Sequence, residues 1–183
     1  MSLHAEARRT LTSWSAPDPA QEALRRDFVD HLDRHDDAVW RSCAPAHVTA
    51  SSLVVDPARR RVLLVLHGKV NLWLPSGGHC EPGDASLADT ALREAVEETG
   101  IAGLRLADPT RPTCLDRHAA PCAPGVVEHH LDVHYLAIAP PEAVPTVSDE
   151  SHDVAWFGFD SLPDLIGDDV PGLVRHARRL TAR

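Results

Sequence analysis

Residues 77–84 read GGHCEPGD, and residues 93–101 read REAVEETGI. The two glycines predict a turn, and the residues after it predict a helix from about residue 86 to residue 99. Within this helix Glu94, Glu97 and Glu98 are spaced i, i+3 and i+4, so their carboxylates project from one face. A divalent cation would remove their mutual repulsion, because clustered carboxylate oxygens are ligands suited to Mg²⁺. The pattern therefore predicts a metal site that holds a diphosphate.

These residues resemble the signature of the Nudix hydrolase family. That signature is Gly, five residues, Glu, seven residues, and then Arg-Glu-apolar-x-Glu-Glu-x-Gly-apolar. Here Gly78 begins it, and residues 93–101 end it with every required residue type. Two departures stand out, because Asp84 replaces the first Glu and eight residues separate it from Arg93. We expect the loop before the helix to absorb the extra residue without rotating the later carboxylates.

The resemblance covers about residues 47–165 and implies an α/β/α sandwich with a mixed sheet. We expect residues 47–183 to form the Nudix domain, with strands near residues 48–55, 61–67, 126–138 and 154–159. Residues 103–125 are expected to form an irregular loop with a short strand. A helical turn is expected at residues 161–166, and a terminal helix at residues 171–183.

Residues 1–46 predict a helical extension that precedes this domain. A first helix is expected from Leu3 to Trp14. Asp18 is a good N-cap for a second helix, because Pro19 follows at the first helical position. Apolar residues then recur every fourth position to about His35. We expect this stripe to pack on the main domain or on a second copy of the chain, which would make a homodimer.

Composition narrows the partners and the compartment. The chain has 183 residues and a formal net charge of −9, which disfavours binding to nucleic-acid polymers or anionic membranes. Its four cysteines form no CxxC pair, which fits free thiols in a reducing cytoplasm. No apolar run approaches the ~20 residues that span a bilayer, so we expect a cytoplasmic protein with a small-molecule diphosphate substrate.

The resemblance implies roles for the carboxylates and for their neighbours. Glu97 and Glu98 would be metal ligands, together with the backbone carbonyl of Gly77. Glu94 would be either a third ligand or the general base for water, and both roles suit a carboxylate beside metal-bound water. Arg93 would orient the carboxylates within the catalytic site. The expected cofactor is Mg²⁺, with Mn²⁺ as a substitute.

An acidic segment before the last predicted strand offers a further candidate. The family often has one more acidic residue there, which supplies a metal ligand or the base. Glu150 is our choice for this catalytic role, ahead of Asp149 and Asp153. The alternative is a solvated acidic loop without a role in catalysis.

Four residues are candidates for binding the substrate: Gly78, His79, Asp84 and Trp73. Asp84 would either support a metal or cap the following helix, where negative charge is favoured. Trp73 would either stack on a base or pack in the domain. His130, Asp132 and His134 alternate onto one strand face, so one of these histidines, or His79, could face the substrate phosphates. The alternative is that each histidine is an ordinary polar residue.

The predicted function is hydrolysis of the diphosphate linkage in a nucleoside diphosphate derivative. One alternative is a non-catalytic Nudix-like ligand-binding module. Such modules usually lose the carboxylates of the signature, and this chain keeps all three. A second alternative is isopentenyl diphosphate isomerase, which shares the fold. That enzyme would need a catalytic cysteine in a suitable motif, and neither Cys43 nor Cys80 stands in one.

Overall fold

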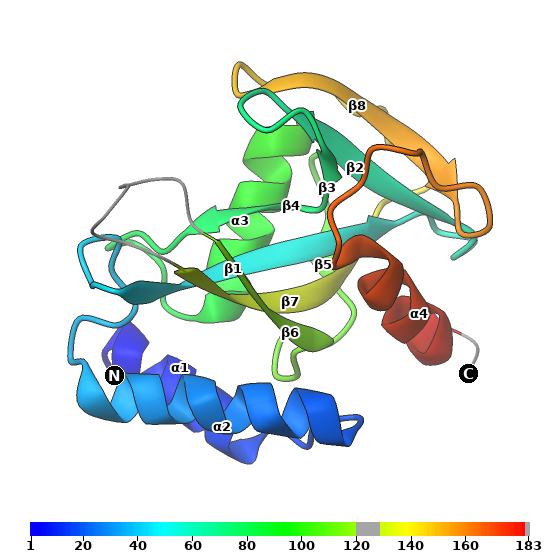
Figure 1. Ribbon diagram of the computed structural model, residues 1–183. Coiled ribbons are helices and arrows are strands. Elements are labelled where there is room, and N and C mark those ends of the chain that lie inside the picture. The colour runs from blue at the N-terminus through cyan, green and yellow to red at the C-terminus, as the bar shows by residue number, and fades with distance from the viewer. Residues whose placement is uncertain (120–128, 182–183) are drawn as a thin grey trace.

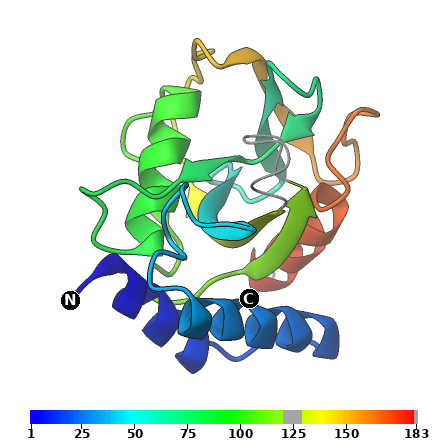
Figure 2. The same cartoon turned by 60° about the vertical axis from the view of Figure 1, so that its left-hand side comes forward.

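The computed structural model describes residues 1–119 and 129–181. A mixed eight-stranded sheet lies between two helices, with α3 (Leu87–Thr99) on one side and α4 (Val170–Thr181) on the other (Figures 1 and 2). This arrangement confirms the α/β/α sandwich with a mixed sheet. Among the helices of the described residues, none is long and apolar enough to cross a membrane.

The sheet is built around β1 (Ala46–Val55), which is buried at every position. One edge of β1 pairs in parallel with β7 (His129–Ile138) along its whole length. The other edge pairs antiparallel with β4 (Ser76–His79) and then with β2 (Arg61–His67). The remaining strands extend the sheet on either side: β3 (Trp73–Leu74), β5 (Arg105–Leu106), β6 (Cys114–Ala119) and β8 (Ser151–Gly158).

The two faces of β1 carry different side chains, because successive residues of a strand point to opposite faces. Ala50 and Val54 belong to the apolar clusters on the α3 side. Leu53 and Val55 pack in the cluster that includes α4. On that same face the first half of the strand presents His47, a threonine and a serine instead. The sheet therefore has a buried polar area beside its apolar core.

The N-terminal residues form two helices, α1 (Leu3–Ser13) and α2 (Pro19–Arg34), which lie together beside the sheet (Figure 1). Asp18 caps α2 as predicted, and its side chain accepts a hydrogen bond from the Gln21 amide. Phe28 and Leu32 are buried in a core cluster shared with the sheet. The apolar stripe thus packs on the chain's own domain. A homodimer stays a prediction, and this stripe no longer supports it.

Gln21 joins α2 to the sheet through both polar atoms of its side chain. The side-chain nitrogen Nε2 of Gln21 donates to the Leu115 carbonyl at 2.9 Å, and Gln21 Oε1 accepts from the Leu115 backbone amide at 2.6 Å. The side chain therefore satisfies backbone groups of β6 that would otherwise be exposed at a strand edge.

Three local predictions were wrong. Residues 103–119 contain the two strands β5 and β6 instead of an irregular loop with one short strand, and the rest of that predicted loop lies outside the described residues. The glycines at 77 and 78 lie in a strand instead of a turn, because β4 pairs with a partner far away in the sequence. Residues 161–166 form isolated bridges, Gly158 with Ser161 and Trp73 with Ile166, in place of a helical turn. The helix predicted at about residues 86–99 is confirmed as α3. Ser86 is its N-cap, and Gly100, in the left-handed conformation, is its C-cap.

Candidate active site

Gly77 and Gly78 allow β4 to pass closely between β1 and α3. A Cβ added at Gly77 would lie 2.0 Å from Ser51 Oγ and 2.7 Å from Ser51 Cα. A Cβ at Gly78 would lie 2.6 Å from Glu94 Oε1. These distances are far below van der Waals contact. Gly77 is therefore required by close packing against the backbone of β1, whereas a side chain at Gly78 would displace the Glu94 carboxylate.

We expect Gly77→Ala to lower the free energy of unfolding by about 1–3 kcal/mol, the usual cost of overpacking. The new methyl group meets the backbone of Ser51, which cannot turn away. Gly83→Ala is the matched control, because a Cβ there would have no neighbour within 4 Å. Urea unfolding of both variants measures the difference. Equal transition midpoints would contradict this account of β4.

Glu98 is the most buried of the three signature glutamates on α3, with 9% of its surface exposed. Its Oε2 accepts a hydrogen bond from the Gly77 amide at 3.1 Å. Burial, reinforced by the charges of Glu94, Glu150 and Glu97, raises the pKa of Glu98 to about 8. Without a cation, this carboxyl therefore keeps its proton at neutral pH. A bound metal ion would compete with that proton for the same oxygens.

Arg93 connects the carboxylates to the strand and to the loop before the helix. Its Nη1 donates to Glu94 Oε1 and Glu97 Oε2, both at 3.0 Å. Its Nη2 donates to the His79 carbonyl at 2.8 Å. Nε and Nη2 also donate to the two oxygens of Asp84, each at 3.1 Å. A single guanidinium therefore sets the positions of two signature carboxylates relative to β4.

Both carboxylate oxygens of Asp84 accept hydrogen bonds from the protein. Besides Arg93, it accepts hydrogen bonds from the Glu81 amide at 2.9 Å and Thr90 Oγ1 at 2.8 Å. Burial alone would raise the pKa of Asp84, but these donors and Arg93 lower it below its usual value. Helix capping, one of the two roles considered for Asp84, belongs to Ser86. The turn before Ser86 accommodates the extra residue and leaves Asp84 against Arg93.

Glu150 lies with the signature carboxylates although it is distant in sequence. It immediately precedes β8, and its carbonyl accepts a hydrogen bond from the Gly68 amide at 3.1 Å. Its charge contributes to raising the pKa of both Glu94 and Glu98. For Glu94 burial is the largest cause, and Arg93 opposes it. Glu94, Glu97, Glu98 and Glu150 therefore interact electrostatically, and together they are called the acidic group.

Trp73 and the ring of His79 lie apart from this acidic group. Trp73 packs edge-on against Phe157, with ring centroids 4.8 Å apart, beside the cluster under α4. His79 contacts Arg93 through its carbonyl. Its ring lies among other histidines, 5.0 Å from the ring of His47 and 5.1 Å from that of His130. Substrate binding by Trp73, His79, Asp84 and Gly78 remains a prediction.

A buried polar network lies on the same face of the sheet as these histidines. Asp132 accepts hydrogen bonds from Thr49 Oγ1 at 2.9 Å and Ser51 Oγ at 2.6 Å. His134 Nε2 lies 3.2 Å from its second oxygen. The alternation of residues 130–134 predicted the β7 side of this network. The β1 side was missed, although His47, Thr49 and Ser51 alternate in the same way.

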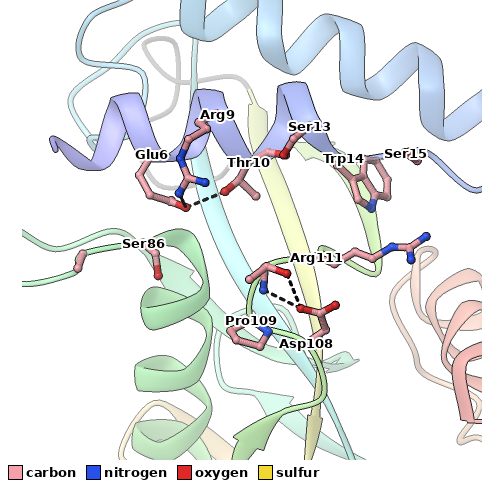
Figure 3. A pocket seen from close by; sticks show the side chains of 12 residues that line it. Glu6, Arg9, Thr10, Ser13, Trp14, Ser15, Ser86, Asp108, Pro109 and Arg111 are labelled. Atoms are coloured by element: carbon pink, nitrogen blue, oxygen red, sulfur yellow. Dashed lines mark hydrogen bonds and ion pairs between the residues drawn. The ribbon is translucent and has the colours of Figure 1, made fainter.

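A cavity of about 670 Å³ lies between α1 and the residues that follow β5 (Figure 3). Its polar lining includes Glu6, Arg9 and Thr10, and Glu6 Oε1 accepts a hydrogen bond from Thr10 Oγ1 at 2.7 Å. Glu6 Oε2 also accepts from the Leu87 amide at the start of α3. None of the residues that line the cavity belongs to the acidic group.

Comparison with known proteins defines the family. The model of the NUDIX domain matches residues 45–179, and the chain belongs to the Nudix family. It is an enzyme of the class that hydrolyses phosphoric anhydride bonds. Members of this family generally use a divalent metal ion. No curated protein matches the chain.

Solved structures share the fold. A NUDIX-family hydrolase from Clostridium perfringens is 25% identical with a TM-score of 0.60, over 74% of this chain and 97% of that one. An ADP-ribose pyrophosphatase from Streptococcus suis is 16% identical, with a TM-score of 0.55 over 74% and 92%. The NUDIX domain of Shewanella oneidensis NrtR, complexed with ADP ribose, is 19% identical, with a TM-score of 0.56 over 83% and 97%.

Proposed function

We propose that the chain is a Mg²⁺-dependent hydrolase that cleaves the diphosphate linkage of a nucleoside diphosphate derivative. One observation carries the proposal. Glu98 is buried, is hydrogen-bonded to the Gly77 amide, and has its pKa raised to about 8 beside three other carboxylates. Burial of an ionised carboxylate is costly without a partner of opposite charge, so this position is suited to a bound cation.

The donor set fits a hard divalent cation. Glu94, Glu97, Glu98 and Glu150 offer oxygens alone, and Arg93 is the cation that contacts two of them. Mg²⁺ prefers oxygen ligands and keeps several waters, so it needs few protein ligands beside the phosphates of a substrate. Glu97 is the most open of the signature carboxylates, with 57% of its side chain exposed. We assign Glu97 and Glu98 as ligands, with the carbonyl of Gly77.

Glu94, Glu150 and Arg93 would have different roles in the reaction. Bound metal would polarise the diphosphate and lower the pKa of the attacking water. Glu94 would remove a proton from water, a role supported by the burial that raises its pKa above the usual value and by Arg93, which holds its side chain. Glu150 is the alternative base. Arg93 is a positioning residue, since its guanidinium is occupied by carboxylates and a carbonyl of the protein itself.

The substrate class is supported by two neighbours of the same fold. One is described as an ADP-ribose pyrophosphatase and another was solved with ADP ribose, and both names refer to a nucleoside diphosphate linked to a further group. The two alternatives have less support. The retained carboxylates argue against a module that only binds. In an isomerase, a reactive cysteine is needed, yet burial raises the pKa of Cys43 to about 12 and of Cys80 to about 11.

A substrate panel tests the proposal. Nucleoside triphosphates, dinucleotides and nucleotide sugars are incubated with the protein, with and without Mg²⁺, and phosphorylated products are measured. We expect Mg²⁺-dependent turnover of nucleotide-diphosphate compounds, and a roughly 10²–10³-fold loss in Glu97→Gln, as for loss of one group that stabilises charge in a transition state. Glu142→Gln, at an exposed loop position, is the control. Turnover that is unchanged without metal would contradict the proposal.

A further inference from the structure

Four histidines lie side by side across four neighbouring strands, on the face of the sheet opposite α3. His47 of β1 is the register partner of His130 of β7, and His130 is also the partner of His118 of β6. His79 of β4 pairs with Thr49, two residues along the same face of β1. The cross-strand positions therefore bring together imidazoles that are up to 83 residues apart in the chain.

Three of these rings form a nearly equilateral triangle. The ring centroids are 4.9 Å apart for His47 and His130, 5.0 Å for His47 and His79, and 5.1 Å for His79 and His130. One ring nitrogen from each lies within 4.8 Å of the other two. Nitrogens bound to a tetrahedral Zn²⁺ at ~2.0–2.1 Å are about 3.3 Å apart. Small ring rotations would bring the three nitrogens to that separation.

The hydrogen bonds around the triangle favour ligation through Nε2. His47 Nδ1 faces the Cys43 carbonyl at 3.5 Å, which places the hydrogen on Nδ1 and the lone pair on Nε2. Asp116 lies 2.8 Å from His118 Nδ1, and His118 Nε2 lies 3.3 Å from His130 Nδ1. This carboxylate–histidine–histidine series orients His130 in the way that outer partners orient histidines that bind a metal.

Burial of imidazole nitrogens without partners costs free energy of folding unless a ligand binds to them. His47 is fully buried. Within residues 1–119 and 129–181, Nε2 of His47 and Nε2 of His79 have no hydrogen-bond partner. A buried polar atom without a partner costs about 1–3 kcal/mol. Such an atom in a folded protein points to a bound water or ion, and here two of them belong to rings of the histidine triangle.

We propose that His47, His79 and His130 bind a divalent transition metal ion of the Zn²⁺ class. Imidazole nitrogens select Zn²⁺, Co²⁺ or Ni²⁺, whereas Mg²⁺ requires oxygen ligands. The site is therefore chemically distinct from the acidic group on α3. Three histidines leave a fourth coordination position for water or for a group of a ligand. The metal would also fix His79, whose carbonyl holds Arg93.

Titration with Co²⁺ tests the site in the presence of excess Mg²⁺. The protein is stripped with a chelator first, and binding is followed through the visible d–d absorption of Co²⁺. We expect one Co²⁺ per chain, displaced by Zn²⁺ but not by Mg²⁺. His79→Asn and His130→Asn should each weaken binding by roughly 100-fold, at least as much as loss of an outer partner. Equal affinity in these variants would overturn the proposal.

Two control variants distinguish Co²⁺ bound by the histidine triangle from Co²⁺ bound elsewhere on the chain. His129→Asn changes the neighbouring residue of β7, which points to the opposite face, and it should bind Co²⁺ as the unchanged chain does. Glu97→Gln combined with Glu98→Gln removes the charge of two members of the acidic group and should also keep binding, whatever the outcome of the hydrolysis assay. Circular dichroism shows that each variant is folded.

X-ray absorption of the Zn²⁺ form provides a test without any substitution. We expect at least three imidazole nitrogens at about 2.0–2.1 Å from the metal. A shell made of oxygen alone, or no stoichiometric binding of Zn²⁺ or Co²⁺ by the unchanged chain, would overturn the proposal. A stable variant is not needed for this measurement, so misfolding cannot obscure its result.

Discussion

Glu98→Gln should strongly reduce metal-dependent hydrolysis and at the same time stabilise the metal-free protein. The amide keeps an oxygen that can accept the hydrogen bond from the Gly77 amide, but it removes the charge that a cation needs. We expect activity to fall by roughly 10²–10³-fold, as for loss of one group that stabilises charge in a transition state. Binding of Mg²⁺ should weaken in parallel.

The stabilisation has a defined pH dependence. The pKa of Glu98 is raised from 4.5 to about 8 in the folded protein. The metal-free protein therefore loses stability as the pH rises from about 4.5 to 8, because the unfolded chain ionises more easily. Glu98→Gln removes this loss, by as much as about 5 kcal/mol above pH 8 and less than about 1 kcal/mol at pH 5.

Urea unfolding at several pH values, with a chelator and then with Mg²⁺, measures both effects. With the chelator, the free energy of unfolding of the variant should exceed that of the unchanged chain at pH 8 and approach it at pH 5. Adding Mg²⁺ should stabilise the unchanged chain and not the variant, because a ligand stabilises the state that binds it. Glu142→Gln should behave as the unchanged chain throughout. A variant that is less stable at pH 8 would show that Glu98 is not under electrostatic strain.

The sequence predicted those parts of the fold that depend on local chemistry. Asp18 and Ser86 are side chains that accept hydrogen bonds from the first turn of a helix, and Gly100 adopts the left-handed conformation that ends one. Each of these signals lies within a few residues of the structure it determines. β2 likewise spans the predicted residues 61–67, and residues 62–65 of its apolar run are buried.

Pairing between distant segments could not be read in the same way. β4 contains two glycines, which favour loops, and only its register with β1 makes it a strand. The three carboxylates of α3 were predicted together because helical spacing is local. Glu150 was placed near them through the family resemblance. The histidines of the triangle come from three strands that are far apart in the sequence. No short window of sequence therefore contains two of them.

Arg93→Gln should destabilise the protein more than loss of any single carboxylate that Arg93 contacts. It leaves Asp84, whose side chain is 6% exposed, as a buried carboxylate that has lost its cation. Breaking a buried ion pair by removing one partner costs about 3–5 kcal/mol. Glu94 and Glu97 also lose their donor. Activity should fall by roughly 10–100-fold, the usual effect of removing a group that orients metal ligands.

A double-mutant cycle distinguishes this ion pair from a general loss of packing. Asp84→Asn should cost less than Arg93→Gln, because Arg93 still contacts Glu94, Glu97 and the His79 carbonyl. In the double variant no buried charge is left alone at Asp84, so the two losses should not add. We expect a coupling of about 1–3 kcal/mol from urea unfolding. Arg105→Gln, on the exposed side of β5, is the control. Additive losses would mean that Asp84 and Arg93 act separately, and that the departure of this chain from the family signature has no bearing on how its carboxylates are held.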